Sequence, residues 1–134
     1  MTEDFCSFEI SKLLKEKGFD EDCLMYYMEN RKHIRDLVDE EWPKRLRNSK
    51  AKEDVITVPT HQMALKWLRE INNIHITISL ASDCRYKYEV YKLHSNYPTE
   101  LKLSEESEEY YLFYQEATEA AIQYCLEHLL PKSE

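Results

Sequence analysis

The sequence feature that most constrains the fold is a change of hydrophobic period within residues 60–93. In the first part of this stretch apolar side chains recur every three or four residues, which predicts an amphipathic helix. Pro59 disfavours helix before Thr60, whose hydroxyl can cap the first turn, and we expect the helix to stop at Asn72 and Asn73. The apolar stripe of this helix consists of Met63, Ala64, Trp67, Leu68 and Ile71.

The period then changes to two, which predicts a β-hairpin with one apolar face. We expect residues 81–83 to form the turn and Ile78 to stand opposite Tyr86. The same register sets His75 against Glu89, and a slip of one residue would mix apolar with charged partners. The predicted helix then covers the apolar face, which consists of Ile74, Ile76, Ile78, Leu80, Tyr86, Tyr88 and Val90.

Patterns elsewhere predict two further helices and three further strands. The helices are expected at residues 7–18, capped by Ser7 and ended by Gly18, and at residues 116–130. The strands are expected at residues 23–28, 55–58 and 110–114, with a loop at residues 94–107.

These elements predict an α+β fold in which three helices pack on one face of a four- or five-stranded, mainly antiparallel sheet. The length is that of one domain, so we expect residues 1–134 to form a single domain. Mixed charge without a clear hydrophobic period predicts a variable charged excursion from this domain at about residues 29–54.

Composition argues against several classes of protein. The 134-residue chain has a formal net charge of −8, which disfavours general binding to nucleic acid because phosphate contacts need positive charge. Gly18 is the only glycine, so the chain has no glycine-rich phosphate-binding loop. Apolar runs are too short for a membrane span, and the first residues lack the pattern of a secretory signal. We therefore expect a cytoplasmic protein without a membrane partner.

The spacing of the reactive residues predicts no metal ligand, no cofactor and no catalytic residue. Cys6, Cys23, Cys84 and Cys125 form no CxxC pair and are expected to be reduced and buried. The five histidines form no HxH, HxxxH or HExxH pair.

The best local constellation lies on the polar face of the predicted hairpin. His75 is expected beside Glu89, with Lys87 next to them, and a carboxylate can orient and charge an imidazole. A small-ligand binder or an enzyme could use these groups. A solvated sheet face explains the same residues, because antiparallel sheets often leave one face in water.

The many tyrosines favour a binding module over an enzyme, since tyrosine is common in interfaces. Tyr91 and Leu93 on the polar face of the hairpin are predicted to form a shallow apolar patch with Tyr110, Leu112 or Tyr114. Such a patch would mark contact with another protein or self-association. Alternatively, residues 29–54 fold over the patch and make it part of the core.

A basic cluster at residues 44–52, which includes Lys44, Arg45 and Arg47, is the one place where nucleic acid or an acidic partner could bind. A solvated loop is the simpler interpretation, because charge runs without interleaved aromatic residues usually form plain surface. We therefore do not expect nucleic acid as the main partner.

Three blocks of the sequence resemble a group of short proteins, without a known activity, from gut-bacterial (Bacteroides-type) genomes and their phages. The blocks are residues 7–20, then Pro59-Thr60 with Ala64 and residues 67–70, and finally Glu116-Ala117 with Ala120-Ala121. The resemblance implies a small intracellular accessory protein of a bacterial or prophage genome, and it implies no catalytic residue. The predicted function is therefore that of a non-enzymatic accessory protein acting by protein contacts. A ligand binder or enzyme at His75 and Glu89 is one alternative, and a nucleic-acid-associated protein acting through residues 44–52 is another.

Overall fold

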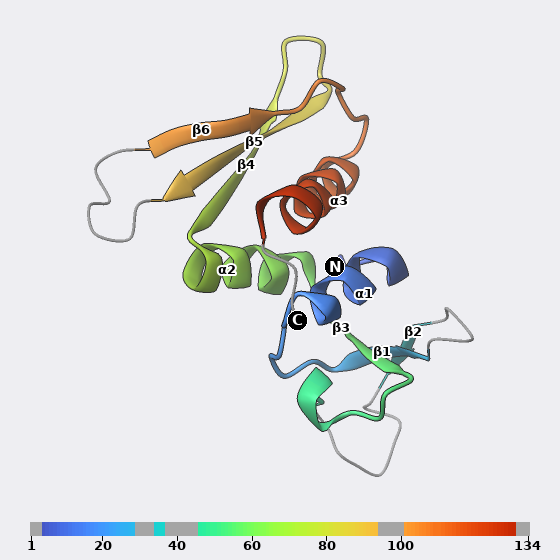
Figure 1. Ribbon diagram of the computed structural model, residues 1–134. Coiled ribbons are helices and arrows are strands. Elements are labelled where there is room, and N and C mark those ends of the chain that lie inside the picture. The colour runs from blue at the N-terminus through green and yellow to red at the C-terminus, as the bar shows by residue number, and fades with distance from the viewer. Residues whose placement is uncertain (1–3, 29–33, 37–45, 94–100, 131–134) are drawn as a thin grey trace. The chain divides into compact units, whose positions relative to one another are not determined.

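The computed structural model describes residues 4–28, 34–36, 46–93 and 101–130 (Figure 1). The chain divides into two compact units, Met1–Thr60 with Pro131–Glu134, and His61–Leu130. Each unit contains one three-stranded antiparallel sheet. The helices within the described ranges are all too short or too polar to cross a membrane. The single domain stays a prediction, since two compact units can still fold as one.

The first unit packs one helix against a small sheet (Figure 1). Its strands are β1 (Met25–Met28), β2 (Ile34–Asp36) and β3 (Val55–Val58), in the order β2-β1-β3. Helix α1 (Phe8–Glu16) lies against β3, whose four residues are all buried. A single turn of 3-10 helix, η2 (Asn48–Lys50), precedes β3.

Helix α1 begins and ends where the sequence predicts. The Ser7 Oγ accepts a hydrogen bond from the Ile10 amide at 3.3 Å, as an N-cap does. Gly18 has a φ of +94°, the left-handed conformation that ends many helices. The chain therefore turns back, so that the Phe19 amide donates to the Leu14 carbonyl at 2.9 Å and the Phe19 side chain is buried.

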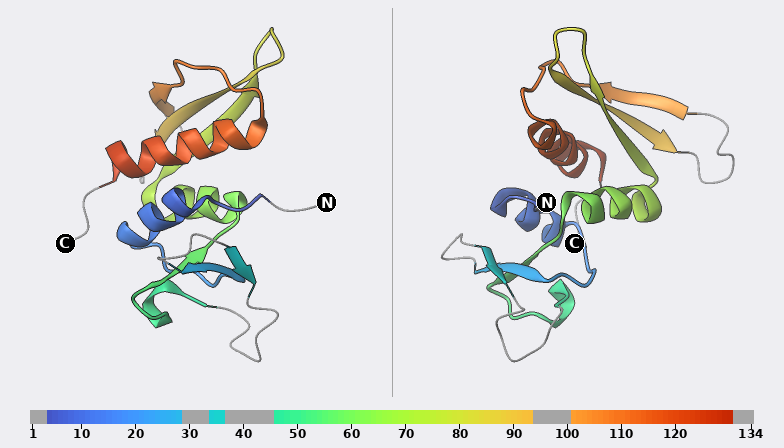
Figure 2. Two further views of the ribbon diagram at one scale, coloured as in Figure 1. Left: turned by 90° about the vertical axis from the view of Figure 1, so that its right-hand side faces the viewer. Right: turned by 180° about the vertical axis from the view of Figure 1, so that it is seen from behind.

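The second unit places two helices on one face of its sheet (Figures 1 and 2). The strands β4 (Ile74–Leu80), β5 (Tyr86–Leu93) and β6 (Leu101–Glu106) run in the order β4-β5-β6. Helix α2 (His61–Asn72) leads directly into β4, and helix α3 (Tyr114–Tyr124) packs against β5 and β4. A π-helical turn, η3 (Cys125–Leu129), continues α3.

The core of the second unit lies between the sheet and these two helices. Small alanines let α3 lie close to the sheet. A further link joins the helices, since the Nε2 of the buried His61 lies 3.0 Å from Oε1 of Glu119. The buried apolar side chains of this unit are Ala64, Trp67, Leu68, Ile74, Tyr88, Val90, Ala117, Ala121, Ile122, Cys125 and Leu126.

The α+β class is confirmed, but the predicted single sheet is wrong. The strands form two separate three-stranded sheets, with α1 on one and α2 and α3 on the other. Hydrophobic period identifies strands but does not say which strands pair. Residues 101–106 form β6 instead of the predicted loop, and residues 110–114 form no strand, because Tyr111 alone bridges to Tyr86 and α3 already starts at Tyr114.

The predicted register of the hairpin is wrong by two residues. Ile78 stands opposite Tyr88, so that Thr77 faces Glu89 and His75 faces Tyr91. A shift of two residues leaves every side chain on its original face. The apolar pattern therefore excludes a slip of one residue but cannot exclude a slip of two.

The turn chemistry explains the observed register. The Ala81 amide donates to the Arg85 carbonyl at 2.7 Å, and the Cys84 amide donates to the Ala81 carbonyl at 3.0 Å. These bonds leave residues 82–84 as a three-residue loop, a common hairpin connection that ends in a left-handed residue. Cys84 is that residue, with a φ of +67°. It is exposed, so the prediction that it is buried is wrong. Cys6, Cys23 and Cys125 are free and buried, as expected.

Two further predictions have mixed outcomes. In the helix stripe Trp67 and Leu68 are buried, but Ile71 is 62% exposed in the last turn of α2. In the charged excursion the structure gives β2, η2 and a bridge between Leu46 and Cys23, whereas residues 29–33 and 37–45 lie outside the described residues.

We expect Leu68→Ala to lower the free energy of unfolding by about 2–5 kcal/mol, because it leaves a cavity in the core. Ile71→Ala, on the same helix, is the matched control and should change that free energy by less than about 0.5 kcal/mol, since the side chain is mostly in water. Urea unfolding followed by circular dichroism measures both. An equal cost at the two positions would contradict this description of α2.

Candidate functional site

The most distinctive surface of the second unit is formed by residues 107–113, the segment between β6 and α3. Hydrogen bonds attach the backbone of this segment to the sheet. The Tyr86 amide donates to the Tyr111 carbonyl at 2.7 Å, and the Tyr111 amide donates back to Tyr86 at 2.8 Å. The Ser107 amide donates to the Tyr88 carbonyl at 2.9 Å, while the Ser107 hydroxyl accepts from the Tyr88 amide at 3.1 Å. The segment is therefore attached to β5 at two points.

Aromatic contacts hold the inner side of this segment. The Tyr111 ring stacks on the Tyr88 ring with the centroids 6.4 Å apart. Tyr88 belongs to β5, against which α3 packs, and its side chain is buried. This burial raises the pKa of Tyr88 to about 12. The Tyr114 ring meets the Tyr86 ring edge-on at 5.7 Å.

The outer side of the segment is apolar and faces solvent. Leu112 is 70% exposed and Phe113 is 56% exposed. Leu80, 60% exposed, belongs to the same region because it stands opposite Tyr86. Of the seven large hydrophobic side chains exposed among the described residues, five lie here. We call these five the aromatic surface: Leu80, Tyr110, Leu112, Phe113 and Tyr114.

Acidic residues flank the aromatic surface in sequence. Exposed carboxylates come just before it at Glu108 and Glu109 and just after it at Glu116. The Arg85 guanidinium lies over the Tyr110 ring, 5.6 Å from its centroid, and forms an ion pair with Asp83 at 2.6 Å. The surface is thus an apolar patch with a negative border.

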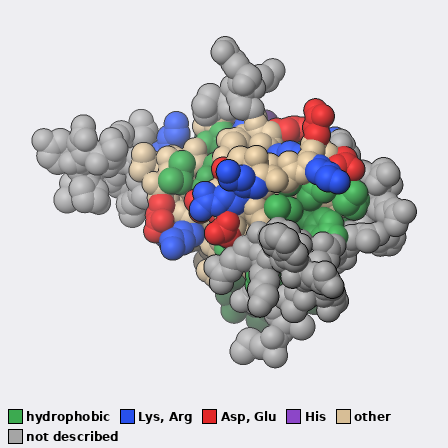
Figure 3. All heavy atoms as spheres, turned by 90° about the horizontal axis from the view of Figure 1, so that it is seen from below, with side chains coloured by type: hydrophobic (Ala, Val, Ile, Leu, Met, Phe, Trp, Pro, Cys, Tyr) green, Lys and Arg blue, Asp and Glu red, His purple; other side chains and the backbone are tan. Residues whose placement is uncertain are grey.

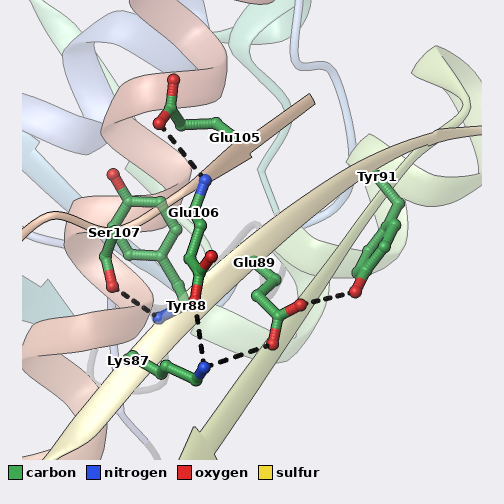
Figure 4. A network of polar contacts seen from close by, with 7 residues as sticks. All are labelled: Lys87, Tyr88, Glu89, Tyr91, Glu105, Glu106 and Ser107. Atoms are coloured by element: carbon green, nitrogen blue, oxygen red, sulfur yellow. Dashed lines mark hydrogen bonds and ion pairs between the residues drawn. The ribbon is translucent and has the colours of Figure 1, made fainter. Parts of the chain in front are cut away.

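The polar face of the hairpin holds a network of paired charges (Figure 4). The Tyr91 hydroxyl donates to Glu89 Oε2 at 2.6 Å, and this bond raises the pKa of Tyr91. The Lys87 ammonium lies 3.0 Å from Glu106 Oε1 and 4.0 Å from Glu89 Oε1. The bond to Glu106 is the main reason that the pKa of Lys87 is raised. The four side chains therefore satisfy one another.

The structure brings together only some of the residues predicted for this face. Lys87, Glu89 and Tyr91 share the network, but His75 stands opposite Tyr91, and the imidazole of His75 makes no hydrogen bond or ion pair with any described residue. The expected contact of His75 with Glu89 is wrong for the reason given above, the two-residue shift of register. Leu93 pairs with Leu101 in the sheet, and the side chains of both lie outside the described residues.

The predicted basic cluster is described only in part. Lys44 and Arg45 lie outside the described residues, and the Arg47 Nε donates to Asp22 Oδ1 at 2.9 Å. On the face drawn in Figure 3, the coloured lysine and arginine side chains are interspersed with acidic ones and form no continuous basic surface.

Reactive groups do not gather elsewhere in the described part of the chain. No group of three histidine, cysteine, aspartate or glutamate residues there could hold a metal ion. Burial raises the pKa of Cys23 to about 11 and that of Cys125 to about 12, so these thiols stay protonated at neutral pH.

Comparison with known proteins gives no relative for this arrangement: no family model matches the chain, and no curated protein or solved structure matches it significantly. The resemblance to short bacterial and phage proteins stays a prediction.

Sequence reasoning pointed to residues 110–114 but missed Phe113 and Leu80 as exposed residues. The five consecutive apolar residues Tyr110, Tyr111, Leu112, Phe113 and Tyr114 suggested a strand covered on both sides. The available signal was the acidic residues on either side, which favour a segment at the surface.

We expect the protein to lose stability as the pH rises from about 10 to about 12. Tyrosine in the unfolded chain ionises near pH 10, whereas Tyr88 in the folded chain stays neutral until about 12. A group whose pKa is raised by folding contributes its full stabilisation at a pH below its pKa in the unfolded chain. That stabilisation is lost as the pH rises from this pKa to the pKa in the folded chain. Tyr88→Phe should reduce the fall in the free energy of unfolding between about pH 9 and pH 11, measured by urea unfolding. An unchanged fall would contradict the burial of this phenol.

Proposed function

We propose that the protein is a small accessory protein that acts by contact with another protein, and that the aromatic surface is its contact site. The observation that supports this proposal is the run of exposed apolar side chains at Leu112 and Phe113, held between two backbone attachments and the start of α3. Monomeric proteins rarely expose a contiguous apolar patch of this kind unless it binds something.

The rigidity of the segment supports the same proposal. The mutual bonds of Tyr86 and Tyr111 fix the backbone, so that binding does not have to order it. Aromatic side chains also lose little conformational entropy when they are buried, which is one reason that they dominate binding energy in interfaces. The pinned segment therefore presents its apolar side chains in advance of binding.

The negative border favours a partner with an apolar segment flanked by lysine or arginine. Charges at the rim of an interface mainly raise the rate of association and exclude partners of like charge. The net charge of −8 acts in the same direction over longer distances. Association through the aromatic surface should therefore weaken moderately as salt is added.

The polar face of the hairpin supports a ligand-binding or catalytic role less well. Lys87, Glu89 and Tyr91 bond to one another and to Glu106, so a ligand would have to displace these internal bonds. His75 stands opposite Tyr91 and not opposite Glu89, the carboxylate that was expected to orient it. The nucleic-acid alternative depends on Lys44 and Arg45, which lie outside the described residues.

A photo-crosslinking amino acid placed at position 112, in cells that make the protein, tests the proposal. We expect one discrete adduct with another protein, because Leu112 is the most exposed member of the aromatic surface. The same amino acid at Glu70, an exposed position of α2, is the control and should give no such adduct. Gel electrophoresis followed by mass spectrometry identifies the adduct.

Leu112→Ser should abolish the crosslink from a second probe at position 110 and leave the melting temperature unchanged. Ile71→Ser is the matched control, since it removes an equally apolar and similarly exposed side chain outside the aromatic surface. Loss of the adduct in both variants, or adducts of the same kind from position 70, would show that the aromatic surface is not the contact site.

A further inference from the structure

Among the residues that the structure describes, strand β4 forms an open edge of the second unit's sheet, because the order β4-β5-β6 leaves one side of it without a neighbouring strand (Figure 2). The turn bonds direct the N–H and C=O of Ala81 toward β5. Along a strand these groups point alternately to the two sides. The backbone groups of Ile76, Ile78 and Leu80 therefore point away from β5, and they have no hydrogen-bonding partner among the described residues.

This edge lacks the features that normally prevent strands of different molecules from pairing. From Ile74 to Leu80 the strand contains no Asp, Glu, Lys or Arg, no proline and no glycine. The opposite edge is different, since β6 carries Lys102, Glu105 and Glu106 and a bulge interrupts its pairing with β5. One edge of the sheet is therefore protected and the other is not.

We propose that β4 pairs with β4 of a second copy of this chain, edge to edge and antiparallel, about a two-fold axis at Thr77. In this register Ile76 of one copy stands opposite Ile78 of the other, and Leu80 stands opposite Ile74. All of these residues direct their backbone groups to the open side, so each pair exchanges both N–H···O bonds. The register also keeps apolar side chains beside apolar ones on the face that the helices cover.

The absence of Asp, Glu, Lys and Arg from β4 lets a second copy occupy this edge without bringing like charges together. Each copy carries a net charge of −8, so a contact between identical surfaces is opposed wherever carboxylates meet. The strand β4 brings no Asp, Glu, Lys or Arg to the contact. In the proposed register its polar residues meet one another: Thr77 stands opposite Thr77, and His75 stands opposite Ser79.

A buried hydroxyl without a partner supports the same pairing. The Ser79 Oγ is shielded from solvent and makes no hydrogen bond with the described residues. Burying such a group without a bond is costly. In the proposed register Ser79 faces His75 of the second copy in a pair without backbone bonds, where side chains approach most closely. Rotation of the Ser79 side chain toward the edge then lets a ring nitrogen of that histidine supply the missing hydrogen bond.

Measurement of mass against concentration tests the proposal. The chain has a mass of 16.2 kDa, and we expect the wild-type mass to rise toward twice that value as concentration increases. Thr77→Lys should weaken dimerisation at least about tenfold, because two lysines would face each other on the axis. The folded monomer should tolerate this lysine, since Thr77 stands opposite Glu89 within its own sheet. Gln62→Lys on α2 adds the same charge away from the edge and should dimerise like the wild type.

A disulfide at the axis tests the register even where Thr77→Lys alters stability. Paired residues without backbone bonds have Cα atoms about 4.5 Å apart, which a disulfide can span. In a Cys84→Ser background, Thr77→Cys should form a covalent dimer under mild oxidation, whereas Gln62→Cys should not. Leu112→Ser should leave dimerisation unchanged, because it alters only the aromatic surface. A mass of 16.2 kDa at every concentration up to about 1 mM, unimpaired dimerisation of Thr77→Lys, or no crosslink from Thr77→Cys would overturn the proposal.

Discussion

The arrangement of the second unit depends on the three-residue turn between β4 and β5. The bonds of Ala81 with Arg85 and Cys84 fix which residues of the two strands face each other. They also fix the side to which each backbone group of β5 points, so that Tyr86 and Tyr88 are directed toward the segment that follows β6. A different turn would change the polar pairs of the hairpin.

The same alternation divides the sheet into regions with different physical properties. One face is apolar and covered by α2 and α3, while the other holds the network of Lys87, Glu89, Tyr91 and Glu106. One edge is charged and the other is neutral. The segment between β6 and α3 is attached to this sheet by backbone hydrogen bonds, while its Leu112 and Phe113 side chains stay exposed.

The sequence predicts those features of the fold that depend on local period and caps. The limits of α1, the burial of Trp67 and the face of each residue in the hairpin follow from such patterns. Strand pairing and register depend instead on contacts between distant segments and on a left-handed residue at Cys84, which is rare for cysteine. Ile71 fits the helix stripe but is exposed, because period says nothing about where the surface that a helix covers comes to an end. The sequence indicated only part of the aromatic surface. An apolar run such as residues 110–114 is typical both of a buried strand and of an exposed binding surface, and the run alone does not distinguish the two.

The scarcity of glycine has a consequence for the unfolded chain. With Gly18 as its only glycine, the unfolded polypeptide has less backbone freedom than most chains of 134 residues, and folding therefore costs less entropy. Part of this advantage is offset in the folded state, where Asn73 and Cys84 adopt positive φ values of 57° and 67° at a cost of about 1 kcal/mol each. Asparagine tolerates the left-handed region better than cysteine does, so the strain is greater at Cys84. Glycine at Cys84 would relieve that strain by more than the entropy that it adds to the unfolded chain, so this turn lowers the stability of the folded protein.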